Sequence, residues 1–336
     1  MSVIVIVFNR REFILEAVNS VLCQDIPKGS VEIIVSKNYS DENIDLFLNE
    51  KGVINIVDFV NGIGPRLANC IRISKGSVIS FLEDDDTWES NKLTVALREF
   101  EKDQNLGYYH NSYTSMNDLS VTTKEWIHHK NIRNRKKISL TPDLTCELSY
   151  IMRYSPNFNL SSITISKNLA LEILTDLTSL SYAVDVFLFF KSLSKGYTNM
   201  LDSSKLTKYR IHQSSMNKAG TFLEFKTHSL SVYEDHYRSI SSIFDSITNH
   251  EIREFILSYH KEWSVRISIL KGNTNRIILA RELFSNVHLF FLRKDYSKYI
   301  YFLGWLALFF PRVTQHAYYF YLKNALERYN SRKRNR

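Results

Sequence analysis

Four consecutive carboxylates, Glu83 to Asp86, are the residues best suited to chemistry in this sequence. Like charges this close repel one another, so ordering them costs free energy unless a cation is present. They directly follow the apolar run at residues 77–82, which predicts a buried strand, and ligands of open α/β sheets bind at such strand ends. Because Mg²⁺ is usually held by one or two carboxylates plus substrate phosphates, the cluster predicts a site for Mg²⁺ or Mn²⁺. The alternative is a solvated acidic turn that caps the next helix.

Strand and helix patterns alternate on either side of this cluster. Residues 3–8 form a continuous, mostly β-branched run of the kind found in strands buried on both faces. Asn9 is then a predicted helix N-cap, with Glu12 as its capping-box partner, and a second buried strand is predicted at residues 31–35. Repeated strand–helix–strand units predict an α/β fold with a mainly parallel central sheet.

The last third of the chain has a different character. Residues 221–336 show apolar positions at helical spacing with little Gly or Pro, which predicts a helical region after a catalytic domain over residues 1–220. Charge divides at the same point, because residues 1–220 hold 25 basic and 25 acidic residues while residues 221–336 hold 18 and 10. The whole formal net charge of +8 therefore lies in the helical region.

Residues 299–310 of this region form an almost unbroken apolar run with Lys and Arg on both sides. The run is too short to cross a hydrocarbon core of ~30 Å, which needs ~20 residues. It predicts either contact of residues 293–336 with an anionic membrane surface, or a helix that packs in a core or joins a homo-oligomer. Three widely spaced cysteines and no signal-peptide pattern predict a cytoplasmic protein, either free or peripheral on the cytoplasmic face of the membrane.

Three blocks, in the right order, resemble glycosyltransferase family 2, which has the GT-A fold. Residues 81–88, Phe-Leu-Glu-Asp-Asp-Asp-Thr-Trp, resemble the family's Phe-Leu-Asp-x-Asp-Asp-x-Trp block, which contains its DxD element. Residues 184–191 resemble its Glu-Asp-x-x-Leu-x-x-Arg helix, and residues 208–212 resemble its Tyr-Arg-x-His block. The opening strand with Asn9-Arg10 also looks like the family's, so the resemblance covers about residues 2–215.

The resemblance implies an inverting, metal-dependent glycosyltransferase. Asp185 falls on the general-base position, where a carboxylate takes the proton from the acceptor hydroxyl as it attacks the anomeric carbon. Its apolar neighbours should raise its pKa, which suits a base; the alternative is a helix N-terminal Asp favoured by the helix dipole. The metal ligands implied are Glu83, Asp85, Asp86 and His212.

Donor binding is expected at positions that match or neighbour the family's nucleotide-sugar site: Phe8, Asn9, Arg10, Lys37, Asn38, Arg66, Asp84, Trp88 and Arg210. Lys37 stands where the family often has an Asp that contacts the base. Because Lys cannot accept a hydrogen bond from a base imide, a UDP-sugar is the default donor only. For Trp88 the alternative is ordinary packing at the start of a helix.

The implied partners are a nucleotide-sugar donor and a glycan or lipid-linked acceptor, in the assembly of a glycan, a glycolipid or a cell-surface polysaccharide. Departures from the family pattern at Glu83, Lys37 and Val184 also fit a catalytically inactive GT-A-like scaffold. The basic C-terminal region also fits a nucleic-acid-binding protein. The zero net charge of residues 1–220 and the acidic cluster argue against a nucleic-acid-binding protein, and no RNP, KH or zinc-finger pattern occurs.

Overall fold

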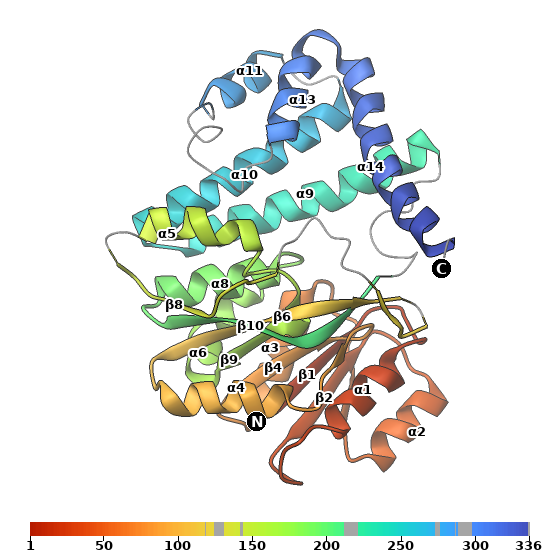
Figure 1. Ribbon diagram of the computed structural model, residues 1–336, viewed down its shortest axis with the longest axis vertical. Helices are drawn as coiled ribbons and strands as arrows, with labels where there is room; N and C mark the ends of the chain where they lie inside the picture. The colour runs from red at the N-terminus through yellow and green to blue at the C-terminus, as the bar shows by residue number, and fades with distance from the viewer. Residues whose placement is uncertain are drawn as a thin grey trace. The chain divides into compact units, whose positions relative to one another are not determined.

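The computed structural model describes residues 1–117, 119–123, 131–141, 144–211, 221–272, 276–285, 287 and 298–334, without the side chains of Arg153 and of residues 324–334. The chain divides into two compact units, which we call the sheet unit and the helical unit (Figure 1). The sheet unit consists of Met1–Leu144, Tyr154–Ile211 and Ser246–Thr248, and the helical unit of Thr145–Arg153, His212–Asp245 and Asn249–Arg336. The functional boundary expected at residue 220 stays a prediction.

The described residues of the sheet unit form a ten-stranded mixed sheet. Its main path runs in the order β3 (Ile54–Val57), β2 (Glu32–Lys37), β1 (Ser2–Val7), β4 (Val78–Glu83), β9 (Ile163–Ser166), β6 (Leu106–Met116), β10 (Thr198–Arg210) and β5 (Thr87–Trp88). Strands β3, β2, β1 and β4 are parallel, as are β6 and β10, whereas β9 is antiparallel to both of its neighbours. Short strands β7 (Thr122–Thr123) and β8 (Lys136–Ile138) pair with β6 and β10. The predicted α/β fold is confirmed.

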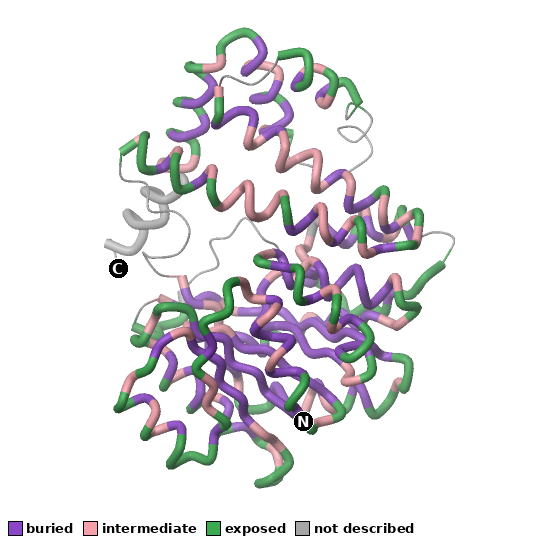
Figure 2. The backbone as a smooth tube through the Cα atoms, turned by 180° about the vertical axis from the view of Figure 1, so that it is seen from behind, coloured by how far each residue is buried: buried purple, intermediate pink, exposed green. Residues whose placement is uncertain are grey.

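Helices flank the sheet, and the strands in its middle are largely buried (Figures 1 and 2). They are α1 (Ile14–Leu22), α2 (Glu42–Glu50), α3 (Ile63–Ile73), α4 (Lys92–Lys102), α6 (Lys167–Glu172), α7 (Leu174–Leu177) and α8 (Val184–Ser194), with a 3₁₀ turn at Leu160–Ser162. Strand β1 is buried along its whole length, which explains its continuous apolar sequence. Its residue Ile6 pairs with Ser36 of β2 and with Glu83 of β4, so the carboxyl ends of the three strands meet at one edge of the sheet.

The predicted N-cap at Asn9 is wrong. Helix α1 begins at Ile14, Phe13 is its N-cap residue, and no side chain caps the helix. Asn9 has a left-handed backbone with φ 56°, and its side chain is paired with Asn38 across the neighbouring strand end. The capping-box prediction failed because the side chain of Asn9 accepts a hydrogen bond from Asn38, a residue distant in sequence, and does not cap the helix.

The helical unit contains α5 (Leu144–Ile151), whose first residue belongs to the sheet unit, and α9 (Phe222–Ser246), α10 (His250–Lys271), α11 (Arg276–Ser285), α13 (Lys298–Phe309) and α14 (Pro311–Arg334). Its core joins apolar residues of α10, α11, α13 and α14. Helix α10 ends at Lys271 and is capped by Gly272, whose positive φ suits a C-terminal cap. Pro311 begins α14, where its missing N–H is not needed. No helix in the described part of the chain is both long and apolar enough to cross a membrane.

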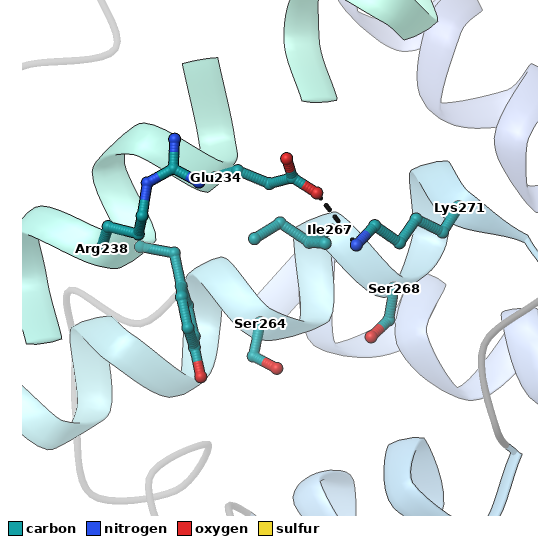
Figure 3. Close-up of a pocket in the computed structure, with 7 residues that line it drawn as sticks. Glu234, Arg238, Ser264, Ile267, Ser268 and Lys271 are labelled. Carbon is teal, nitrogen blue, oxygen red and sulfur yellow. Dashed lines mark ion pairs between the residues drawn. The ribbon is translucent and has the colours of Figure 1, made fainter. Parts of the chain in front are cut away.

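A hollow of about 410 Å³ lies within the helical unit, between α9 and α10 (Figure 3). An ion pair of 2.9 Å between Glu234 and Lys271 links the two helices beside it, and Ser264 and Ser268 line its α10 side. None of the described residues that were predicted to bind the donor or the metal lines this hollow.

Candidate active site

The acidic cluster forms the end of β4 and the tight turn after it. The turn is closed by a hydrogen bond from Asp86 N–H to Glu83 O at 3.2 Å, and Ser161 Oγ accepts the N–H of Glu83 at 3.0 Å. Asp84 is buried, and one of its oxygens accepts the N–H of Phe8 at 3.3 Å. The side chain of Phe8 is itself exposed beside this turn. The predicted strand end and its carboxylates therefore meet the end of β1.

Arg10 is the cation that faces these carboxylates. Its Nη1 donates to Asp85 Oδ2 at 2.5 Å, and its Nη2 and Nε both donate to Asp84, the latter at 3.4 Å. Burial alone would lower the pKa of Arg10, but Asp85 and Asp84 outweigh burial and raise the pKa above its usual value. For Asp84, burial and Asp85 outweigh Arg10 and raise the pKa to about 6.

The turn that carries Arg10 is held from the end of β2. Asn9 N–H donates to Asn38 Oδ1 at 2.9 Å, and Asn38 Nδ2 donates back to Asn9 Oδ1 at 2.8 Å. The hydroxyl of Tyr39 donates to the carbonyl of Arg10 at 2.5 Å. Left-handed backbone at a residue other than Gly costs energy and is found at functional sites, and these bonds offset that cost at Asn9.

Arg210 fixes the far side of the acidic turn. Its N–H donates to Asp86 Oδ1 at 2.8 Å, and its Nε donates to the carbonyl of Asp85 at 2.6 Å. Its guanidinium also pairs with Glu16 of α1 at 2.6 Å and donates to Ser120 Oγ at 3.0 Å. Arg210 thus ties the end of β10, the acidic turn and α1 together.

Asp86 is the most strongly buried member of the cluster. Among the described residues its Oδ2 has no hydrogen-bond partner, which is unusual for a buried carboxylate oxygen. Burial, followed by the charge of Asp85, raises the pKa of Asp86 to about 8. The pKa of Glu83 is raised by burial, then by Asp86, Asp85 and Asp185. These carboxylates therefore lie close enough for the charge of one to raise the pKa of another.

Asp185 lies in the first turn of α8. The residue before that helix, Ala183, has a left-handed backbone with φ 56°. The N–H of Val186 donates to Asp185 Oδ1 at 2.9 Å, which orients the carboxylate. Burial raises the pKa of Asp185 to about 6 against this hydrogen bond, although part of its surface is still exposed. A carboxylate whose pKa is raised towards neutral pH and whose surface is partly exposed has the properties of a general base.

The donor set of the cluster fits a hard divalent cation. Glu83 and Asp85 offer carboxylate oxygens, and the buried Oδ2 of Asp86 has no hydrogen-bond partner in the described part of the chain. No group of three or more His, Cys, Asp and Glu side chains among the described residues is arranged to hold a metal ion. A site completed by substrate phosphates needs only one or two carboxylates. The predicted ligand His212 lies outside the described residues.

Besides Asp84 and Arg210, three further residues predicted to bind the donor are buried. Lys37 is fully buried, and its Nζ donates to the carbonyl of Tyr39 at 2.8 Å and pairs with Asp45 at 2.6 Å. Arg66 is 2% exposed, and its guanidinium donates to Ser36. Trp88 is 4% exposed, and its indole N–H donates to the carbonyl of Ser161 at 2.9 Å. Direct contact of these three side chains with a donor stays a prediction.

The segment at residues 156–162 contributes to the site, although no site residue was predicted there from the sequence. The hydroxyl of Ser161 accepts the N–H of Glu83, and its carbonyl accepts the indole N–H of Trp88. Asn159, two residues earlier, has a left-handed backbone with φ 72°, and its side chain caps the turn by accepting the N–H of Ser161. Glu16, the partner of Arg210, was missed as well. The density of Asn and Ser in Pro156–Ser162 is the one signal that could have indicated a functional turn here.

Comparison with known families decides the class of the sheet unit. Residues 2–155 match the family model described as "Glycosyl transferase family 2". These residues belong to a domain of that family. The resemblance is thus confirmed over residues 2–155, and the chain carries a glycosyltransferase domain. The blocks at residues 184–191 and 208–212 lie outside the match and stay predictions. Comparison with the curated proteins finds no match.

Solved structures show the same fold at low sequence identity. The structure of S. aureus TarS 1-349 in complex with UDP-GlcNAc matches 97% of this chain and 91% of that chain, with 15% identity and a TM-score of 0.56. The mannosyltransferase PcManGT from Pyrobaculum calidifontis, in complex with GDP-Man and Mn²⁺, matches 97% of this chain and 85% of that chain, with 14% identity and a TM-score of 0.52. A longer S. aureus TarS structure matches with 14% identity and a TM-score of 0.52; the match covers 96% of this chain and 55% of that one, so this chain spans about half its length.

Proposed function

We propose that this protein is an inverting glycosyltransferase that moves a sugar from a nucleotide-diphosphate sugar to an acceptor hydroxyl. The observation that carries the proposal is the approach of Asp185 to the acidic cluster, since its charge raises the pKa of Glu83. A base on α8 thereby stands near the carboxylates expected to receive the donor diphosphate, which are carried by β4 and the turn after it. Family membership and the two donor-bound structural neighbours support the same reaction class.

Asp185 receives the proton of the acceptor hydroxyl in this proposal. The hydroxyl oxygen forms a bond to the anomeric carbon while the bond from that carbon to the diphosphate oxygen breaks, so configuration inverts in one displacement. The raised pKa of about 6 leaves Asp185 ionised at neutral pH and yet more basic than an ordinary Asp. The N–H of Val186 holds the carboxylate in place.

The diphosphate is proposed to lie against the acidic turn and Arg10. Glu83, Asp85 and Asp86 would hold Mg²⁺ or Mn²⁺, which supplies positive charge to the leaving diphosphate when bound. Arg10 has a rigid fork of donors that suits phosphate as well as carboxylate. Phe8, Asn9 and Asn38 stand beside this turn at the ends of β1 and β2, and we propose that they meet the nucleoside.

The base can be tested by Asp185→Asn, which keeps the size of the side chain and removes its basicity. Transfer should fall by about a thousandfold or more while donor affinity stays within about twofold, because the base acts only in the chemical step. Asp103→Asn is the control, since Asp103 pairs with Lys137 outside the site. Transfer by Asp185→Asn at a rate close to the wild type would remove Asp185 from this role.

The donor can be identified by calorimetric titration with UDP, GDP and their sugar conjugates, first with Mn²⁺ and then with EDTA. TarS and PcManGT were solved with UDP-GlcNAc and GDP-Man, so both nucleotides are tested. Metal-dependent binding of one nucleotide that is lost in Asp85→Ala supports the proposed donor site. Absence of binding to every nucleoside diphosphate in the presence of metal would favour an inactive scaffold. The acceptor is proposed to be a glycan or a lipid-linked sugar.

A further inference from the structure

Large apolar side chains are exposed along α13 and the first half of α14 in the helical unit. Phe302, Phe309, Phe310, Val313 and Phe320 each expose between 52% and 69% of their surface, and we call this set the aromatic corner. Surface helices in water normally carry polar residues on their outer face. Helix α13 has no charged residue after Lys298, and beyond that position its exposed residues are Phe302 and Phe309.

Helix geometry places these side chains in two stripes. Phe302 and Phe309 are seven residues apart on α13, and Val313 and Phe320 are seven residues apart on α14, so each pair lies on one helix face. The two helices join at Phe310 and Pro311 and pack against each other. Opposite faces hold the core residues, such as Leu303 and Tyr318, so the exposed stripes are not needed to build the unit.

The charged residues on the two helices of the aromatic corner have one sign. Between residues 298 and 323 the chain contains Lys298, Arg312 and Lys323 and no Asp or Glu. Arg312 is exposed and stands in sequence between Phe310 and Val313 of the corner. A second copy docked through the same face would bring positive charges together, which is unfavourable. An anionic surface has the complementary charge.

We propose that the aromatic corner binds the surface of an anionic lipid bilayer. The Phe side chains enter the boundary between headgroups and acyl chains, and Arg312 meets headgroup phosphates. Helix α13 has 12 residues and is about 18 Å long, so it lies along the surface of a hydrocarbon core of ~30 Å. This inference goes beyond the proposed function, because lipid binding requires neither donor nor turnover.

The test is co-sedimentation of the full chain with vesicles. Wild-type protein should sediment with vesicles of phosphatidylglycerol and phosphatidylcholine, and at least tenfold less with phosphatidylcholine alone. The double variant Phe309→Ser/Phe310→Ser should bind the anionic vesicles about tenfold more weakly, since two apolar anchors are lost. The control is Leu46→Ser/Leu171→Ser, which removes two exposed apolar residues of the sheet unit and should bind like the wild type.

A second variant separates charge from burial of apolar surface. Arg312→Gln should weaken binding to anionic vesicles about fivefold without altering any core contact. Circular dichroism shows whether each variant is folded. No sedimentation of the wild type with anionic vesicles, or unchanged sedimentation of Phe309→Ser/Phe310→Ser, would overturn the proposal. Sedimentation velocity that shows a dimer dissociated by the same double variant, without vesicle binding, would assign the corner to self-association.

Discussion

The guanidinium of Arg10 lies on the carboxylate of Asp85, with Nη1 2.5 Å from Oδ2. Asp85 is also the residue that we expect to hold the metal on the donor diphosphate. A guanidinium and a divalent cation cannot occupy the same carboxylate lone pairs, and both are positive. Arg10 therefore offsets part of the negative charge of the acidic turn and competes with a metal ion for Asp85.

Replacement of Arg10 by Met should tighten the binding of Mn²⁺ in the absence of nucleotide by roughly tenfold, because a competing charge is removed from Asp85 and Asp84. Free Mn²⁺ measured by electron paramagnetic resonance during titration gives the affinity without any need for turnover. Arg11→Met is the matched control, since Arg11 pairs with Asp41 and stacks on Tyr39. Equal Mn²⁺ affinity in wild type and Arg10→Met would show that Arg10 does not occupy the metal position.

The rate of transfer should fall on the acid side of a pKa near 6. Asp185 must be ionised to accept the hydroxyl proton, and burial raises its pKa to about 6. Below that pH the rate should drop about tenfold per pH unit at saturating substrates. Steady-state kinetics between pH 4.5 and 8, with Asp103→Asn measured alongside, give the profile. A midpoint near 4 would mean that an unshifted carboxylate, and not Asp185 as placed here, controls the reaction.

The strands that carry the site could be predicted because their signals are local. Residues 3–8 and 77–82 are continuous apolar runs, which are typical of strands buried on both faces, and the structure has β1 and β4 there. The block at residues 81–88 placed the acidic turn directly after β4, and the family match confirms its class. Periodicity and short motifs are sufficient to predict an element when the residues that determine it lie close together in the sequence.

The pairing of charges could not be predicted, since it depends on contacts between distant segments. Arg10 and Asp85 are separated by 75 positions and Arg210 and Glu16 by 194, and neither pair has a sequence signal. Ser161 was missed for the same reason. Its role comes from the antiparallel strand β9, which follows it and lies between β4 and β6.

Replacement of Trp88 by Phe separates packing from donor binding. The indole N–H is buried and donates to the carbonyl of Ser161, so its loss should lower the free energy of unfolding by about 1–2 kcal/mol. Donor affinity should change by less than about twofold if the indole only packs. Denaturant unfolding and calorimetric titration measure the two quantities on the same sample. A large loss of donor affinity with unchanged stability would instead support contact of Trp88 with the donor.

Replacement of Asp86 by Asn should stabilise the protein at pH 8 and much less at pH 5 when EDTA is present. The pKa of Asp86 is about 8 in the folded protein, where burial is the first cause, and about 3.9 in an unfolded chain. Between these values the folded state binds more protons, so wild-type stability falls as pH rises, by about 1.4 kcal/mol per pH unit from this group. Asn keeps an oxygen that accepts the N–H of Arg210 but cannot ionise. Urea unfolding of both proteins at the two pH values measures the difference, and an equal effect of the substitution at pH 5 and pH 8 would refute the raised pKa.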